Sequence, residues 1–316
     1  MPSFTAALIG LSLSGLLLTA CSAKTQPIAD PVQASEPPLT AVDPSSAQAG
    51  LTQTEILDQL AMARVVYLAE VHTSEADHAA QLEIIRALHE RSGDVVERGA
   101  PPLAIAMEMF QRPFQPVLDA YLAGEITEDE LVAQSEYETR WGFPWALYAP
   151  IVRYAQANQL PLIALNTPAE VTRKVSRNGL ASLSGDDLTY IPPISEIDTK
   201  NVDYQAFFAD ITGFNDSDSP HGSAHGGFDF DNFFAAQVLW DETMAAGTAE
   251  FAEANPETQV IVLAGQGHIA FDYGIPDRVQ RRLGDDLVDY SVILTPAEDI
   301  AALGTGPVGD FVWPEE

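Results

Sequence analysis

The sequence predicts an α/β fold, with a mainly parallel sheet, helices on both faces, and a smaller helical cap domain. Short apolar runs rich in β-branched residues recur along the chain, as expected for strands buried on both faces. Segments with helical periodicity separate these runs, and strands that alternate with helices build parallel, right-handed sheets. The expected strands cover residues 65–69, 103–107, 160–165, 259–264 and 287–294.

The helices follow from apolar spacing and from the residues at their ends. Thr52 or Thr54 caps the first, acids fill the first turn of the helix after Thr127, and Gly179 closes the helix after the third strand. Proline, glycine and acid dominate residues 180–231, where we expect a second lid instead of a regular element. The expected helices cover residues 51–63, 74–91, 116–122, 127–134, 144–158, 168–177, 231–246 and 277–283.

The change from strand–helix alternation to a mostly helical tract defines the expected domains. Residues 51–110 and 149–300 form the α/β core, residues 111–148 form the helical cap, and residues 301–316 form an acidic tail. The cap carries an aromatic cluster between Tyr137 and Tyr148. Such a cluster is typical of a hydrophobic core, and the alternative is the wall of a flat apolar pocket.

The single cysteine, Cys21, ends a short apolar stretch that has the length of a signal-peptide core but is too short to span a bilayer. Residues 18–21, Leu-Thr-Ala-Cys, resemble the bacterial lipobox, in which the thiol is acylated, for example with palmitate. We therefore expect a lipoprotein signal peptide at 1–20, a disordered tether at 21–50, and a lipid-anchored protein of the bacterial envelope. The alternative is an ordinary secretion signal with an incidental cysteine.

The net charge of −31, from 46 acidic and 15 basic residues, predicts a strongly acidic surface. Such a surface repels phosphate backbones, so we expect no nucleic-acid partner. Solubility explains the acidity more simply than an acidic functional patch does.

Polar side chains follow four of the expected strands at the point where each strand ends. Because the carboxyl ends of parallel strands meet at one edge of a sheet, we expect these side chains to share a crevice. Carboxylates and imidazoles in one crevice suit acid–base hydrolysis, or a divalent metal held by His72, His268 and Glu108. The alternative for Glu70 and His72 is a structural ion pair. The residues at these strand ends are Glu70, His72, Glu108, Asn166, Gln266 and His268.

His221 and His225 lie in an acidic, glycine-containing loop at residues 216–232. Their spacing is not that of a closed metal site, and a solvated lid explains the loop better than metal binding does. No Walker sequence or GxSxG motif occurs, so a nucleotide-phosphate cradle and a serine elbow have no support.

Five motifs in order, AEVHTSEADHAAQ, AMEMF, PLIALNTP, AAQVLWDETMA and VLAGQGHIAFDYGIP, resemble the ChaN family of bacterial haem-binding lipoproteins. That family belongs to a wider group with the TIKI proteases and erythromycin-esterase-type hydrolases. The resemblance covers about residues 65–284 and implies an α/β core, a smaller helical domain, and dimerisation around haem. One position departs from the family's GExH motif, because Ala69 replaces the glycine. The residues that match the family pattern are Glu70, His72, His78, Gln81, Glu108, Asn166, Asp241 and His268.

The resemblance also implies haem held by a tyrosinate, which suits ferric iron because it is a hard anionic ligand. Tyr137, Tyr148 and Tyr273 are the candidates, with His78, Asn166 and Gln266 as further cofactor contacts. Haem propionates need cations, and Arg112, Arg140 and Arg278 are candidates for that role.

Two functions follow from these observations. The lipobox and the resemblance favour a binding protein that holds haem or an iron chelate for iron uptake at the outer membrane. The polar crevice favours a metal-dependent or acid–base hydrolase, an esterase or peptidase, with Glu70, His72, Glu108 and His268 as catalytic residues.

Overall fold

The structure is a computed structural model that describes residues 50–96, 102–214, 229–295, 300, 303 and 306–314. The expected signal peptide, Cys21, nearly all of the tether, and the loop with His221 and His225 lie outside these residues. Within them, no helix combines the length and the apolar character that crossing a membrane requires.

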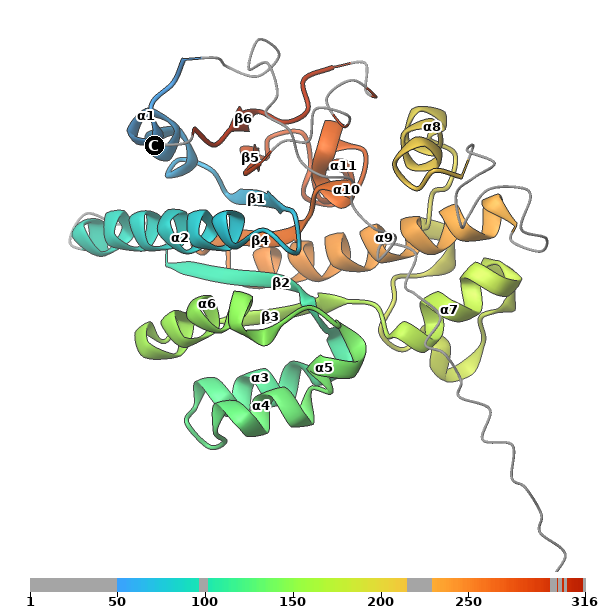
Figure 1. Cartoon of the computed structure of the whole chain (residues 1–316), viewed down its shortest axis with the longest axis horizontal. Coiled ribbons are helices and arrows are strands. Elements are labelled where there is room, and N and C mark those ends of the chain that lie inside the picture. The colour runs from blue at the N-terminus through green and yellow to red at the C-terminus, as the bar shows by residue number, and fades with distance from the viewer. Residues whose placement is uncertain are drawn as a thin grey trace, which may run out of the picture.

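Six strands form one sheet in the order β3-β2-β4-β1-β5-β6, and all of its strand pairs are parallel (Figure 1). This confirms the predicted parallel α/β fold. The central strand β1 pairs with β4 on one side, Val65 opposite Val260, and with β5 on the other, Val65 opposite Asp289. The strands are β1 (Val65–Glu70), β2 (Leu103–Gln111), β3 (Leu162–Asn166), β4 (Gln259–Gly265), β5 (Asp289–Ile293) and β6 (Phe311–Val312).

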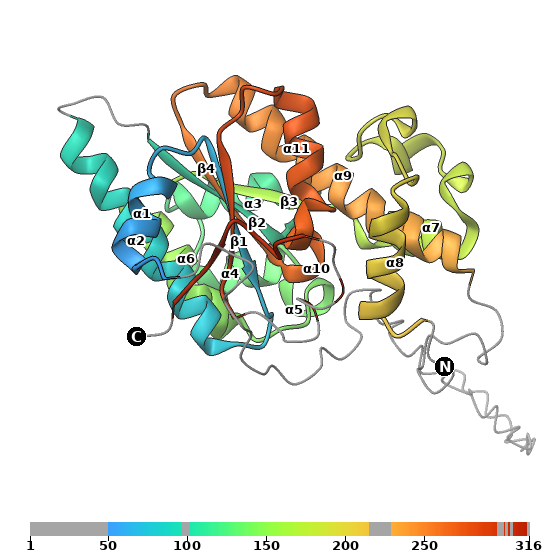
Figure 2. The same cartoon turned by 90° about the horizontal axis from the view of Figure 1, so that it is seen from above.

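Helices cover both faces of the sheet, as predicted. Alternate residues of β1 point to opposite faces, so Tyr67 and Ala69 join one hydrophobic cluster while Val66 and Leu68 join the other. Helices α7, α8, α9 and α11 contribute to the first cluster and α1, α2, α3 and α6 to the second (Figure 2). The helices are α1 (Gln53–Leu60), α2 (Glu75–Val96), α3 (Gln115–Leu122), α4 (Glu128–Gln134), α5 (Tyr137–Arg140), α6 (Trp145–Asn158), α7 (Ala169–Asn178), α8 (Val202–Ile211), α9 (Phe230–Ala254), α10 (Gln266–Ile269) and α11 (Ile275–Leu283).

Local sequence explains where several helices begin and end. Thr52 caps α1 and Thr127 caps α4, each in a reciprocal capping box with the glutamate three residues later. Gly179, with φ 74°, ends α7. A Cβ at that position would lie 2.6 Å from Oδ1 of Asn232, so the glycine also allows α7 to approach the start of α9 closely.

Several elements differ from the sequence-based expectation, and helices α9 and α8 show why. Helix α9 extends to Ala254 instead of ending near residue 246, and it is buried along most of its length, so its apolar residues show little one-sided periodicity. Helix α8 lies in the segment expected to be irregular. It buries Tyr204, Phe207 and Phe208 against α9, at the helical spacing that the surrounding prolines, glycines and acids obscure.

The segments expected to form the cap and the tail both contact the main sheet. Leu118 of α3, Leu131 of α4 and Tyr137 of α5 join the same hydrophobic cluster as α2 and α6. In the expected tail, β6 pairs with β5 and Trp313 is buried. Because β6 has only two residues, it gave no periodic signal in the sequence.

Candidate functional site

Three adjacent strands bring their polar residues together at the carboxyl edge of the sheet. Glu70 ends β1 opposite Gly265, the last residue of β4. Glu108 lies on the other neighbour of β4, where the pairing of β2 with β3 shifts register between Met107 and Gln111. We call the resulting buried group the polar centre, and its members are Glu70, His72, His78, Gln81, Glu108, Tyr148, Tyr204, Asp241 and His268.

Glu70 is fully buried. It contacts the other members of the first half of the polar centre, which are His72, His78, Gln81 and Tyr148. Its Oε1 accepts one hydrogen bond, from the Tyr148 hydroxyl at 2.5 Å, and lies 2.8 Å from Nδ1 of His72. Its Oε2 accepts a hydrogen bond from the Gln81 amide at 2.6 Å and lies 3.5 Å from Nδ1 of His78. Partners from the turn after β1, from α2 and from α6 therefore satisfy this carboxylate, and it links the end of β1 to both helices.

His72 fits between the two halves of the polar centre. A Cβ on Gly265 would lie 2.8 Å from Cε1 of the His72 ring, so only glycine at the end of β4 leaves room for that imidazole. On its other side, the rings of Trp141 and Phe143 each lie 4.8 Å from the His72 ring, centroid to centroid. The packing fixes the ring beside the Glu108 carboxylate.

The second half of the polar centre is a chain of carboxylate, imidazole and carboxylate. Nδ1 of His268 lies 2.6 Å from Oδ1 of Asp241, and its Nε2 lies 3.4 Å from Oε1 of Glu108. Oε2 of Glu108 accepts the Gly265 backbone N–H at 2.8 Å. The Tyr204 hydroxyl donates to Oδ2 of Asp241 at 2.7 Å.

The charges of Glu108 and His268 shift each other's pKa values in opposite directions. Burial raises the pKa of Glu108, but the charges of His268 and His72 and the Gly265 hydrogen bond outweigh burial and lower it. Burial lowers the pKa of His268, yet Glu108 and Asp241 outweigh it and raise the pKa to about 10. Both carboxylates therefore favour the imidazolium form of His268, which lies between them.

The hollow beside the polar centre is small. Its volume is about 20 Å³, room for about one water molecule. Its lining includes His72, Glu108, Trp141, Phe143 and Asn166. A porphyrin, an ester or a peptide does not fit in this conformation. The hydrolase alternative has no room for its substrate here and stays a prediction.

Arg140 holds the aromatic wall of that hollow in place. Its guanidinium donates to Oε1 of Gln111 at 2.8 Å and pairs with Glu170 on α7 at 2.9 Å. It also pairs with Glu136, the residue before α5, at 2.7 Å. Three elements are thus joined over the hollow by an arginine that the resemblance offered as a propionate partner.

The other predicted site residues lie around the polar centre in separate environments. Asn166 is buried and accepts the Thr167 backbone N–H. Gln266 donates to the backbone of Thr295 instead of to the cluster. The hydroxyl of Tyr137 is buried among aromatic rings, and no hydrogen bond to it is found among the described residues. Across the described part of the chain, no three His, Cys, Asp or Glu side chains are placed to hold a metal ion.

Sequence reasoning assigned no site role to three residues that support the polar centre. Tyr204 comes from α8, whose helical spacing is obscured by the surrounding prolines, glycines and acids. Gln237 of α9 donates to the Tyr204 hydroxyl at 3.1 Å. Asp77 accepts from the Val71 backbone N–H at 2.7 Å and from the Ser74 hydroxyl at 2.8 Å, so it fixes the turn after β1. The Ser-x-x-Asp spacing of Ser74 and Asp77 was the available signal.

Comparison with known proteins places the chain in a family. The family model described as "Haem-binding uptake, Tiki superfamily, ChaN" matches residues 56–279, more than half of the chain. The chain belongs to this family, as the sequence motifs predicted.

Solved structures are similar to the chain at lower sequence identity. The solved structure described as cofacial heme binding to ChaN of Campylobacter jejuni is 22% identical, with a TM-score of 0.59, and the match covers 79% of this chain and 88% of that one. At this identity the likeness shows a shared fold. An erythromycin esterase EreC mutant in its open conformation is 15% identical with a TM-score of 0.43, over 82% of this chain and 77% of that one.

A plant protein is also similar to the chain. Protein RETICULATA-RELATED 5, chloroplastic, of Arabidopsis thaliana is 27% identical over 285 residues. The match covers 84% of this chain but only 36% of the plant protein, so the chain spans about a third of that relative's length.

Proposed function

We propose that this protein binds haem or an iron chelate for iron uptake. Membership of the haem-binding uptake family across residues 56–279 is the observation that carries the proposal. The chain also offers a groove of about 790 Å³ outside the polar centre, within the usual size range of cofactor sites. When bound, haem supplies the iron, and the protein's part is to hold the apolar ring, its carboxylates and the metal.

The place of action belongs to the same proposal. Leu18 to Cys21 reads as a lipobox, so we propose a lipid anchor on Cys21 that holds the protein in the bacterial envelope, at the outer membrane. The homodimer implied by the family resemblance would leave haem between two copies. The acidic surface, with a net charge of −31, argues against a nucleic-acid partner.

Haem titration tests the proposal directly. The full chain is titrated with ferric haem at micromolar concentration, and we expect a saturable shift of the Soret band with a defined stoichiometry. The titration is repeated with the acid-denatured and neutralised protein, which controls for haem that adsorbs without a folded site. Absence of a saturable shift in the native protein would remove haem binding.

The anchor is tested separately by mass and fractionation. In a bacterial host, we expect the mature wild-type chain to begin at Cys21, to gain the mass of its acyl groups, and to sediment with membranes. The Cys21→Ser variant should lack the acyl mass and appear in the soluble fraction. Equal fractionation of both chains would refute the anchor and leave haem binding untouched.

A further inference from the structure

A short segment of the chain covers the hollow beside the polar centre. Arg140 ends α5, and Trp141, Gly142 and Phe143 lead from it towards α6. We call residues 140–143 the strap. The rings of Trp141 and Phe143 line the hollow and pack on the His72 ring. Because Phe143 is partly exposed while His72 is only 2% exposed, the strap lies between this imidazole and solvent.

The backbone of the strap has few attachments to the rest of the fold. Trp141 donates to the Tyr137 carbonyl at 2.9 Å, at the end of α5. Within the described residues, the N–H groups of Gly142 and Phe143 donate no backbone hydrogen bond. Gly142 has φ 87°, a conformation that residues other than glycine rarely adopt. A short segment with so few backbone bonds can open without unfolding the helices on either side.

Side-chain contacts of Arg140 hold the strap closed instead. Its guanidinium donates to Gln111 on β2 and pairs with Glu170 on α7, so it joins the strap to two elements of the core. It also lies over the Phe114 ring, 5.1 Å from the centroid. Arg140 is 20% exposed and Glu170 is 59% exposed, so water competes for their ion pair and the pair contributes little stability. These contacts define one closed conformation, and they can be released at low cost.

The hollow under the strap has a polar lining. Thr167 lines it and is fully buried, and its hydroxyl has no hydrogen-bond partner among the described residues. A buried hydroxyl without a partner is costly, so its place calls for an explanation. The side chains of Glu108 and Asn166 line the same hollow. A hydroxyl, a carboxylate and an amide between aromatic rings form the kind of lining that binds a small polar molecule.

We propose that the strap is a gate over a small-molecule site, and that Arg140 is the clasp that keeps it closed. Opening moves Trp141 and Phe143 away from His72 and adds the space of their rings to the hollow. The site then takes a small molecule with a hydroxyl or amide group, which donates a hydrogen bond to Glu108 and accepts one from the Thr167 hydroxyl. This gated site is independent of the proposed haem binding.

The gate is tested by the rate at which diethyl pyrocarbonate acylates each histidine of the full chain. The modified residues are located by tandem mass spectrometry. We expect Arg140→Gln to raise the rate at His72 at least about tenfold, because loss of the clasp makes opening more frequent. Trp141→Ala removes the cover itself and should raise the rate at His72 further.

Two other histidines and one arginine serve as controls. His78 is buried in the polar centre but does not line the hollow, so its rate reports unfolding of the whole core. His89 is partly exposed on α2 and reports the activity of the reagent. Arg153→Gln removes an exposed arginine paired with Glu128 and should leave the rate at His72 as in the wild type. Equal rises at His72 and His78, or wild-type reactivity of His72 in both strap variants, would overturn the gate.

The wild-type chain tests the gate without any substitution. Below the unfolding transition, the rate at His72 should change little with urea, because local opening exposes little surface. The rate at His78 should rise steeply with urea, because only unfolding of the core exposes it. A rate at His72 that rises as steeply as the rate at His78 would overturn the gate.

Acetamide, a small amide, is the probe for the site under the strap. In Arg140→Gln, increasing acetamide should slow the acylation of His72 in a saturable way and leave the rate at His89 unchanged. Adding Thr167→Val, which removes the hydroxyl, should abolish this protection. Acetamide without effect on His72, or equal protection with Thr167→Val, would overturn the site and leave haem binding untouched.

Discussion

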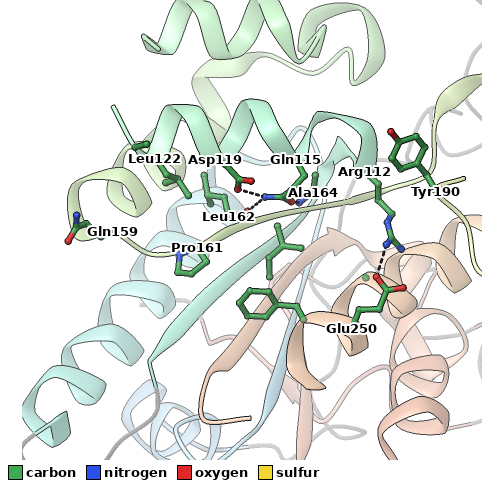
Figure 3. Close-up of a pocket in the computed structure, with 14 residues that line it drawn as sticks. Arg112, Gln115, Asp119, Leu122, Gln159, Pro161, Leu162, Ala164, Tyr190 and Glu250 are labelled. Atoms are coloured by element: carbon green, nitrogen blue, oxygen red, sulfur yellow. Dashed lines mark hydrogen bonds and ion pairs between the residues drawn. The ribbon is translucent and has the colours of Figure 1, made fainter. Parts of the chain in front are cut away.

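A ligand site usually combines polar side chains with open space, but in this protein the two lie apart. The polar side chains gather in the polar centre, and the open space lies in a groove along the edge strand β3, the edge groove, lined by Arg112, Gln115, Leu162 and Glu250 (Figure 3). The polar centre gathers two glutamates, an aspartate and three histidines at the carboxyl ends of the strands, but its hollow measures only about 20 Å³. The edge groove measures about 790 Å³, and Arg112 and Glu250 form an ion pair at its end. Both regions border β3, whose last residue, Asn166, lines the hollow and whose residues Leu162 to Ala164 line the groove. The difference teaches that buried charge marks where the fold is held together, while the larger open space lies at the edge of the sheet.

Pairing and hydrogen bonding explain why the charges of the polar centre can be buried. Burying an unpaired charge is very costly, whereas a charge with opposite neighbours and hydrogen bonds is tolerated. Glu70 has polar neighbours from three elements, and His268 lies between two carboxylates. The ion pair of Arg112 and Glu250 at the end of the groove is instead partly exposed, so it contributes little to stability.

The largest expected effect tests the polar centre as a structural core. Asp241→Ala removes the partner of the His268 imidazolium and the acceptor of the Tyr204 hydroxyl. We expect the free energy of unfolding, measured by urea denaturation, to fall by about 3–5 kcal/mol, because a buried charge loses its partner. The matched control is Asp58→Ala, an exposed partner of Arg91, which should cost less than about 1 kcal/mol.

The same variant can break the comparison. If folded Asp241→Ala binds haem as the wild type does, the polar centre and the ligand site are separate. A tenfold loss of haem affinity in the folded variant would instead show that the polar centre takes part in ligand binding.

The second prediction concerns pH. The pKa of His268 is raised to about 10, so its stabilisation is fully present below the ordinary value near 6.5 and is lost as pH rises through 10. Between pH 7 and 9 the unfolding free energy should fall by about 1.4 kcal/mol per pH unit. The His268→Gln variant should lose this slope, and a wild-type profile that is flat from pH 7 to 9 would contradict the assignment.

A smaller effect sharpens the role of Gln115 in the groove. Gln115→Met keeps the length of the side chain but frees the Leu162 carbonyl and the Ala164 N–H. We expect a loss of about 1 kcal/mol in unfolding free energy and concentration-dependent association through the open strand edge, measured by analytical ultracentrifugation. Gln205→Met, which removes a bond to the Thr199 carbonyl, is the control that should stay unassociated.

The sequence by itself determined the type of fold and the chain positions of its polar residues. Apolar runs identified five of the six strands, because a strand buried on both faces needs continuous apolar residues. Those runs ended at Glu70 and Gln266 and just before Glu108, so polar residues at the sheet's carboxyl edge were predictable. The family resemblance, confirmed by the match over residues 56–279, came from the same motifs.

Only the tertiary structure decided which of these residues meet and what they do. Insertion of β4 between β2 and β1 brings Gly265 to both Glu108 and His72, and no local pattern fixes a strand order. Helix α8 supplies Tyr204 to Asp241 from 37 residues away. The edge groove depends on where β3, α3 and α9 stop packing, and the protonation of His268 depends on two carboxylates distant in sequence. Contacts and electrostatic energies depend on distance in space, which the order of residues along the chain does not set.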